Sequence, residues 1–210
     1  MSERADLTGI VLAGGKSRRL GTDKASLTFE GRLLLETVIE RLSGVCSEVI
    51  VASGRSAEGR KTLRSVRFVA DLAPGRGPLA GVQAGLTAAT AEFALVVACD
   101  MPFLNPHLLS YMAGLPRRYQ ALVPRIAGRW HPAHAIYARS CLPVIEELLA
   151  KRSSSMRELL SRLDVRELPE EELRRYDTQG LSLFNVNEPR DLERARALSD
   201  RSATGPESAP

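Results

Sequence analysis

Short apolar runs alternate along the chain with stretches whose apolar residues recur every three or four positions. The apolar runs predict buried β-strands at residues 10–13, 48–52, 66–70 and 93–99. The longer period predicts amphipathic helices at residues 33–42, 82–91 and 104–112. Strand, helix and strand in succession are typical of a βαβ unit, which pairs its strands in parallel through a right-handed crossover. We therefore expect an α/β protein with a mostly parallel sheet, and its most apolar strand, residues 93–99, at the centre.

The second half of the chain continues with shorter elements. Strands are predicted at residues 120–123, 133–138 and 164–168, and helices at residues 140–151, 156–163 and 189–198. Residues 1–7 are polar and expected to fray, and the small and polar residues 200–210 predict a disordered tail. The length suits one sizeable core, so we expect a single domain over residues 1–199, with halves at about 8–104 and 105–199.

Composition narrows the class of protein. The chain has 210 residues, of which 44% are hydrophobic and 26% charged, as in ordinary soluble globular proteins. Its net charge of +4, without aromatic residues among the basic ones, argues against a dedicated nucleic-acid binder. Three widely spaced cysteines form neither a disulfide framework nor a zinc pattern. Without a membrane-length apolar run or a secretory segment, we expect a cytoplasmic protein and no membrane contact.

The first predicted strand runs into a glycine-rich basic loop. Gly14 and Gly15 allow a tight turn that leaves backbone N–H groups free. Four cations follow within ten residues: Lys16, Arg18, Arg19 and Lys24. Free amides followed by clustered cations suit several phosphates in a row, so the loop predicts a polyphosphate site. A glycine turn beside a solvated basic face is the alternative.

Two better-known phosphate loops do not fit these residues. Gly15, Lys16 and Ser17 resemble the end of a P-loop, but the first glycine of that motif would fall at Ile10. The dinucleotide fingerprint fails as well, because its glycine spacing cannot be placed on residues 14–19. The loop therefore belongs to neither class.

Carboxylates follow two of the predicted strands. Asp71 and Asp100 stand at the carboxyl ends of their strands, where ligands of parallel sheets bind. Mg²⁺ takes one or two carboxylates, although an aspartate there also commonly caps the next helix or turn. Residues 74–81, rich in proline and glycine, form either a rigid connection or a loop that approaches a flat ligand closely.

Two further clusters leave alternatives open. Period-two alternation would turn Asn185 and Asn187 to the same side, toward a ligand, but both asparagines also suit turn capping before a helix that begins at Pro189. His131 and His134 lie three positions apart without a carboxylate or cysteine at ligand spacing, so a zinc site is a minor alternative.

Four segments together resemble a known family. Residues 12–24 are similar to the signature loop of MobA-type molybdenum cofactor guanylyltransferases, and residues 77–81, 100–102 and 185–192 resemble three later motifs of that family in the same order. The likeness spans nearly the whole chain. Two positions depart from the pattern: Glu188 replaces a usual threonine, and Ala52 stands where an asparagine often touches the nucleotide.

The resemblance implies a three-layer Rossmann-like nucleotidyltransferase fold, with a nucleotide half and an acceptor half. The implied reaction transfers GMP from GTP to molybdopterin that already carries molybdenum, and it releases pyrophosphate. Mg²⁺ is the implied cofactor, and transient contacts with cofactor-biosynthesis proteins and apo-molybdoenzymes are the implied protein partners. Arg129, Trp130 and His131 lie in the implied acceptor half, where they could contact a pterin, although no motif supports them individually.

The resemblance also assigns roles to residues. The implied catalytic residues are Arg18, Arg19, Lys24 and Asp100, and Asp100 is also the implied magnesium ligand. The implied nucleotide-binding residues are Leu12, Ala13, Gly14, Gly15, Lys24, Asp71, Gly77, Pro78, Leu79 and Asp100. Asn185 and Asn187 are the implied acceptor-binding residues. Two rival functions remain: a cytidylyl- or sugar-phosphate nucleotidyltransferase with the same loop, and a non-catalytic nucleotide or pterin carrier for molybdoenzymes.

Overall fold

The computed structural model describes residues 5–14, 27–53, 66–71 and 75–203. In this part of the chain eight strands form one sheet in the order β10–β7–β9–β6–β1–β4–β5, with β8 paired to β7 beside that path. The strands are β1 Ala5–Leu12, β4 Cys46–Ser53, β5 Val66–Ala70, β6 Phe93–Ala98, β7 Ala121–Ile126, β8 Arg129–Trp130, β9 His134–Ala138 and β10 Val165–Pro169.

The sheet is mixed but mostly parallel. Strands β6, β1, β4 and β5 pair in parallel, and so do β7 and β10. Strand β9 runs antiparallel to both β6 and β7 and joins the two parallel groups. The expected central strand is confirmed: β6 lies in the middle of the order, and Ala94 to Val97 are fully buried. Burial on both faces explains why this strand is a continuous apolar run.

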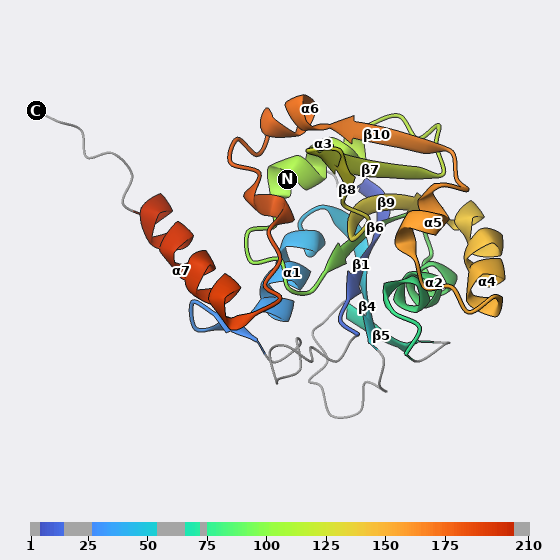
Figure 1. Cartoon of the computed structure of the whole chain (residues 1–210), viewed down its shortest axis with the longest axis horizontal. Helices are drawn as coiled ribbons and strands as arrows, with labels where there is room; N and C mark the ends of the chain where they lie inside the picture. The colour runs from blue at the N-terminus through green and yellow to red at the C-terminus, as the bar shows by residue number, and fades with distance from the viewer. Residues whose placement is uncertain (1–4, 15–26, 54–65, 72–74, 204–210) are drawn as a thin grey trace, which may run out of the picture.

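Helices cover both faces of the sheet. The α-helices are α1 Leu34–Ser43, α2 Pro78–Ala88, α3 Pro106–Gly114, α4 Leu142–Ala150, α5 Met156–Leu160, α6 Glu170–Arg174 and α7 Pro189–Ala203, and the short 3₁₀ helices are η2 Arg139–Cys141 and η3 Leu181–Leu183. Residues of α1, α3 and α6 share one core with the sheet, and residues of α2, α4 and α5 share a second core on the opposite face. Figure 1 shows these groups on either side of the strands. The predicted three-layer α/β fold is confirmed.

Helix α1 shows how the spacing of apolar residues in the sequence places them in the core. The apolar positions of α1 are all 5% exposed or less: Leu34, Leu35, Val38, Ile39 and Leu42. They recur at helical spacing and therefore face the same side. A small third core lies under the β2–β3 hairpin (Thr28–Phe29 and Arg32–Leu33), where Leu34 meets Val186 and Ala195 of the C-terminal segment. This core fixes the start of α7 against the first half of the chain.

The β2–β3 hairpin has a two-residue turn. Glu30 and Gly31 both have positive φ, 51° and 75°, and they join the two short antiparallel strands. A two-residue turn with both φ angles positive matches the twist of a hairpin.

The ends of several elements differ from the sequence prediction. Residues 5–7 belong to β1 and are not frayed: the Ala5 N–H donates to the Val45 carbonyl at 3.0 Å, and Leu7 is fully buried. At the other end, α7 continues to Ala203, so residues 200–203, expected in the tail, are helical. Residues 204–210 lie outside the described part. No helix among the described residues is long and apolar enough to cross a membrane.

Candidate active site

The carboxyl ends of β1, β4, β5 and β6 meet at one edge of the sheet because these strands run in the same direction. Pairing continues past the strand ends: Ala13 N–H donates to the Ala52 carbonyl at 2.8 Å, and Cys99 N–H donates to the Leu12 carbonyl at 3.2 Å. The beginning of the glycine loop is therefore held on both sides. Gly14, the last described residue of this segment, is exposed.

Most of the predicted polyphosphate loop lies outside the described residues. This applies to Gly15 and to the cations Arg18, Arg19 and Lys24, whose roles stay predictions. The described neighbours Leu12, Ala13 and Gly14 form the carboxyl end of β1 and the first turn after it, between β4 and β6.

Asp71 lies at this edge, directly after β5. Its N–H donates to the Ser53 carbonyl at 3.1 Å. Its Oδ1 atom is buried, and no described residue gives it a hydrogen bond. Burial raises the pKa of the Asp71 carboxyl above its ordinary value, because desolvation disfavours the charged form. A buried carboxylate oxygen without a partner is costly, so this atom marks a position where a bound group would be stabilising.

Helix α2 brings a third segment to the same edge. Gly77, with a φ of 68°, turns the chain into the helix, and Pro78 occupies its first position. The helix therefore begins four residues earlier than the periodicity predicted, because Pro78 and Gly77 are start signals that an apolar pattern does not register. A Cβ added to Gly81 would lie 3.0 Å from Leu12 Cδ2 and 3.7 Å from Asp71 Oδ1, so the first turns of α2 lie against both residues.

The predicted nucleotide-binding residues Gly77, Pro78 and Leu79 therefore lie near the candidate site, but they differ in how far they are exposed. Gly77 and Pro78 are exposed, whereas the side chain of Leu79 is fully buried in the core. Of Leu79, only the backbone is left to face a ligand. The first N–H groups of a helix have no partner within the helix, and they suit a polar or anionic ligand.

Asp100 is the most buried acid at this edge, with 2% of its surface exposed. Its Oδ1 accepts a hydrogen bond from the Asn185 side-chain amide at 2.9 Å, and its backbone carbonyl accepts one from Val186 N–H at 2.9 Å. The two segments are 85 positions apart in the chain. The structure thus joins two residues that the sequence analysis singled out separately.

Asp71 and Asp100 are the candidate magnesium ligands at this edge of the sheet. Mg²⁺ prefers carboxylate oxygens and commonly takes only one or two of them, with substrate phosphates and waters completing its shell. The buried carboxylate of Asp100 fits that requirement. Asp71 has an unpartnered Oδ1, but it follows β5, which β1 and β4 separate from β6, so it is not paired with Asp100. The described residues contain no group of three or more histidine, cysteine or acidic side chains placed to hold a metal. The donor set therefore suits a metal shared with a phosphate ligand.

Asn187 differs from Asn185. It is exposed, and the chain around it forms no strand, so the alternation that was expected to align the two amides is absent. Instead the Asp191 carboxylate accepts hydrogen bonds from the N–H groups of Asn187 and Glu188, both at 2.9 Å, at the start of α7. The cap of this turn is thus the aspartate of the motif, and neither asparagine side chain supplies it.

Arg41 supports the loop that follows Asp100 and was missed by the sequence analysis. Its Nη1 donates to the carbonyls of Pro102 and Leu104, each at 2.8 Å. Partial burial lowers the pKa of its guanidinium. A basic residue near the end of an otherwise amphipathic helix gives no signal of this role, because its acceptors are backbone atoms about 60 positions away.

Among the described residues, His131, His134 and Trp130 have other partners or surroundings than a metal site. His134 is fully buried, and its Nε2 lies 3.0 Å from Ser182 Oγ. Burial lowers the pKa of His134 to about 4 and also lowers the pKa of His131. Trp130 Nε1 donates to the Glu167 carboxylate at 2.8 Å. The minor zinc alternative therefore finds no ligand set in the described part of the chain.

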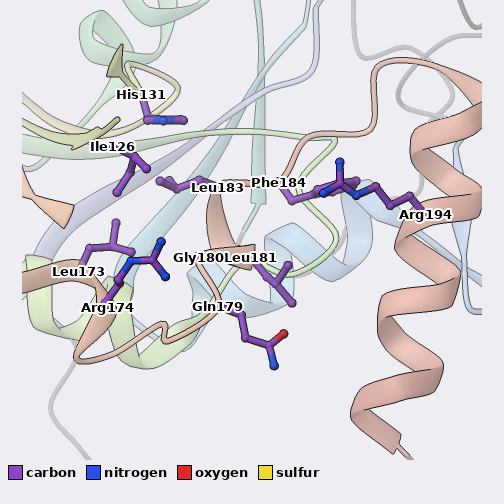
Figure 2. A pocket seen from close by; sticks show the side chains of 10 residues that line it. All are labelled: Ile126, His131, Leu173, Arg174, Gln179, Gly180, Leu181, Leu183, Phe184 and Arg194. Atoms are coloured by element: carbon purple, nitrogen blue, oxygen red, sulfur yellow. The ribbon is translucent and has the colours of Figure 1, made fainter. Parts of the chain in front are cut away.

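A pocket of about 230 Å³ lies in the second half of the chain, the predicted acceptor half. Figure 2 shows Phe184 and Arg194 on one side and Leu173 and Arg174 on the other, with His131 above them. The residues that line the pocket are Ile126, His131, Leu173, Arg174, Gln179, Gly180, Leu181, Leu183, Phe184 and Arg194. His131 is thus the one member of the predicted pterin-contacting trio that lines this pocket.

The fold and the strand-edge site together define an α/β protein of the nucleotidyltransferase class. A family model described as the MobA-like NTP transferase domain matches residues 9–167. The chain belongs to this family, so the resemblance read from its motifs is confirmed.

Curated relatives agree over nearly the whole length. A probable molybdenum cofactor guanylyltransferase of Pelotomaculum thermopropionicum is 38% identical over 94% of this chain and 96% of its own. The molybdenum cofactor guanylyltransferase of Desulfosudis oleivorans is 33% identical, with 91% and 95% of the two chains covered.

Solved structures agree on the fold. Molybdopterin-guanine dinucleotide biosynthesis protein A of Archaeoglobus fulgidus superposes with a TM-score of 0.82 at 30% identity, covering 93% of this chain and all of the other. The 2-C-methyl-D-erythritol 4-phosphate cytidylyltransferase of Thermus thermophilus has a TM-score of 0.68 at 22% identity, with 92% of this chain and 98% of the other covered, and it supports the shared fold alone.

Proposed function

We propose that this protein transfers GMP from GTP to molybdopterin carrying molybdenum, and so forms the guanine dinucleotide cofactor and pyrophosphate. Membership of the MobA-like family supports this reaction, as do two relatives over nearly the whole chain, one named a probable and the other a molybdenum cofactor guanylyltransferase. The structural observation that carries it is the hydrogen bond between Asp100, in the predicted nucleotide half, and Asn185, in the predicted acceptor half. It brings the two halves together at the edge where parallel strands bind ligands.

The chemistry needs no protein nucleophile. The terminal phosphate oxygen of the acceptor attacks the α-phosphorus of GTP, a new P–O bond forms, and the bond from the α-phosphorus to the bridging oxygen breaks as pyrophosphate leaves. Catalysis is then positioning and neutralisation of charge. Gly14 and the backbone at the start of α2 supply N–H groups close to the candidate site, and the exposed Gly77 and Pro78 leave room for a flat base.

The acidic residues and the basic loop have separate roles toward the charged phosphates. In this proposal Asp100 holds Mg²⁺, and Asp71 supports either the metal or the nucleotide through its unpartnered Oδ1. The bound metal would supply charge neutralisation on the phosphates. The predicted role of Arg18, Arg19 and Lys24 is to stabilise charge on the phosphates, and Asn185 and Asn187 are assigned to the acceptor. Release of the product to apo-molybdoenzymes through transient contacts, in the cytoplasm, completes the proposal.

The test is release of pyrophosphate from purified protein with Mg²⁺ and molybdenum-loaded molybdopterin, with GTP, CTP, UTP and ATP offered separately and in competition. The proposal expects release that depends on both the acceptor and GTP. A preference for CTP or UTP selects the cytidylyl or sugar-phosphate branch. Tight binding of GTP or of the pterin without any pyrophosphate selects the non-catalytic carrier.

A further inference from the structure

A buried serine lies next to the segment that carries Asn185. Ser182, in η3, is fully buried, and its hydroxyl oxygen accepts the backbone N–H of Asn105 at 3.0 Å. The same oxygen lies 3.0 Å from Nε2 of the fully buried His134, which is a hydrogen bond in either tautomer. One hydroxyl thus connects η3 to the loop after Asp100 and to strand β9.

Asp177 fixes the backbone of the same turn. Its two carboxylate oxygens accept the N–H groups of Leu181, at 3.2 Å, and of Ser182, at 2.8 Å. Asp177 is 7% exposed, so these bonds form in a largely dry environment, where they are stronger than at the surface. The position of Ser182 is therefore set both through its backbone and through its side chain.

The serine and the active-site contact form two ends of one connection. The segment from Asp100 to Asn105 and the segment from Ser182 to Val186 are joined at one end by Asn105 N–H to Ser182 Oγ. At the other end they are joined by the Asn185 amide and the Val186 N–H, which both donate to Asp100. If the hydrogen bond between Asn105 and Ser182 is lost, only the bonds to Asp100 still hold the segment that carries Asn185.

We propose that Ser182 is a positioning residue for nucleotidyl transfer, which holds the Asn185 amide against the Asp100 carboxylate through its bonds to Asn105 and His134. This inference rests on the proposed function. Removal of the hydroxyl leaves the partly buried Asn105 N–H and the buried His134 ring nitrogen without this partner, so the segment is expected to shift. A displacement of about 1 Å at a catalytic group can cost roughly 100-fold in rate.

The test is a double-mutant cycle in the full-length protein. Ser182→Ala is expected to lower kcat by about 10- to 100-fold with little change in the KM for GTP, because the nucleotide contacts at β1 and α2 are untouched. In an Asn185→Ala background the same change is expected to cost less than about threefold, because the amide that the serine positions is already absent. A merely structural serine predicts instead equal losses in both backgrounds.

A matched control separates positioning from stability. Ser155→Ala removes a serine hydroxyl that caps α5 by accepting the Glu158 N–H at 3.2 Å, and it is expected to lower the melting temperature without a change in kcat. If Ser182→Ala does not fold, the cycle is run with His134→Gln, which alters the partner of the hydroxyl and leaves the serine in place.

The outcomes are distinct. Wild-type kcat for Ser182→Ala, or multiplicative losses with Asn185→Ala in whichever cycle is run, overturns the positioning role while the activity itself stands. Absence of pyrophosphate release from the wild-type protein overturns the proposed function and is seen before any variant is compared.

Discussion

The contact between α2 and β1 gives a prediction whose size follows from the structure. A Cβ added to Gly85 would lie 2.6 Å from Ile10 Cγ2, 2.7 Å from Cδ1 and 3.0 Å from Cγ1. Ile10 is fully buried in the central part of β1, so it has little room to move. Overpacking costs about 1–3 kcal/mol, and contacts this short to a buried side chain place Gly85→Ala in the upper part of that range, at about 2–3 kcal/mol. Alanine regains about 1 kcal/mol of helix propensity, so we expect Gly85→Ala to lower the free energy of unfolding by about 1–2 kcal/mol.

Three variants separate this steric effect from helix propensity. Gly114→Ala, at the last position of α3, adds a Cβ that meets nothing within 4 Å and should be neutral or slightly stabilising. Gly81→Ala, with Leu12 Cδ2 at 3.0 Å, should fall between the two. Since α2 also carries Gly77 to the candidate site, Gly85→Ala should raise the KM for GTP as well.

The assay is urea unfolding followed by circular dichroism, with thermal melts in parallel. A loss of about 1–2 kcal/mol corresponds to roughly 2–8 °C in melting temperature for a domain of this size. Equal stability of Gly85→Ala and wild type would refute the reasoning that the helix rests directly on the strand. So would equal losses at Gly85 and Gly114.

Three other predictions concern buried polar groups. Asp100→Asn should keep the fold but lower turnover on the order of 10²–10³-fold; wild-type-like turnover at limiting Mg²⁺ would contradict this role. Asp71→Asn should raise the stability of the ligand-free protein at neutral pH, because burial raises the pKa of Asp71 and so penalises its charged form. The same variant should raise the KM for GTP. Thermal melts and steady-state kinetics measure the two effects, and a variant less stable than wild type would contradict the prediction. Burial lowers the pKa of His134 to about 4, whereas its pKa in the unfolded chain is about 6.5. Folding therefore favours the neutral ring, and this contribution to stability is complete above about pH 6.5. It is lost toward pH 4 by up to about 1.4 kcal/mol per pH unit. Urea unfolding across this range should therefore show a steeper decline for wild type than for His134→Gln, and parallel curves would exclude the effect.

Hydrophobic patterning predicted the mostly parallel sheet and its central strand, because each strand and helix buries its apolar residues at a regular spacing. The strand at residues 66–70 matches the structure because apolar patterning is a local property. The start of α2 was placed too late, since Pro78 and Gly77 begin the helix through backbone geometry that hydrophobicity does not report. The beginning of β1 was missed because Ala5 is ordered by its bond to Val45, a tertiary contact.

The candidate site was predictable where motifs carry it and not where buried polar contacts support it. Asp100 and Asn185 were each singled out, but their direct hydrogen bond needed the structure. Ser182 and Arg41 escaped notice because a serine in a short turn and an arginine near a helix end are ordinary in sequence. Their roles arise from partners 77 and 61 positions away.

The central claim is that the α-phosphorus of GTP ends in the pterin dinucleotide while the β- and γ-phosphates leave together. The direct measurement supplies GTP labelled at the α-phosphorus, and separately at the γ-phosphorus, with Mg²⁺ and molybdenum-loaded molybdopterin. We expect the α-label in the dinucleotide product and the γ-label in pyrophosphate. Label from the γ-position in the product, or free GMP without any labelled dinucleotide, would contradict guanylyl transfer by this protein.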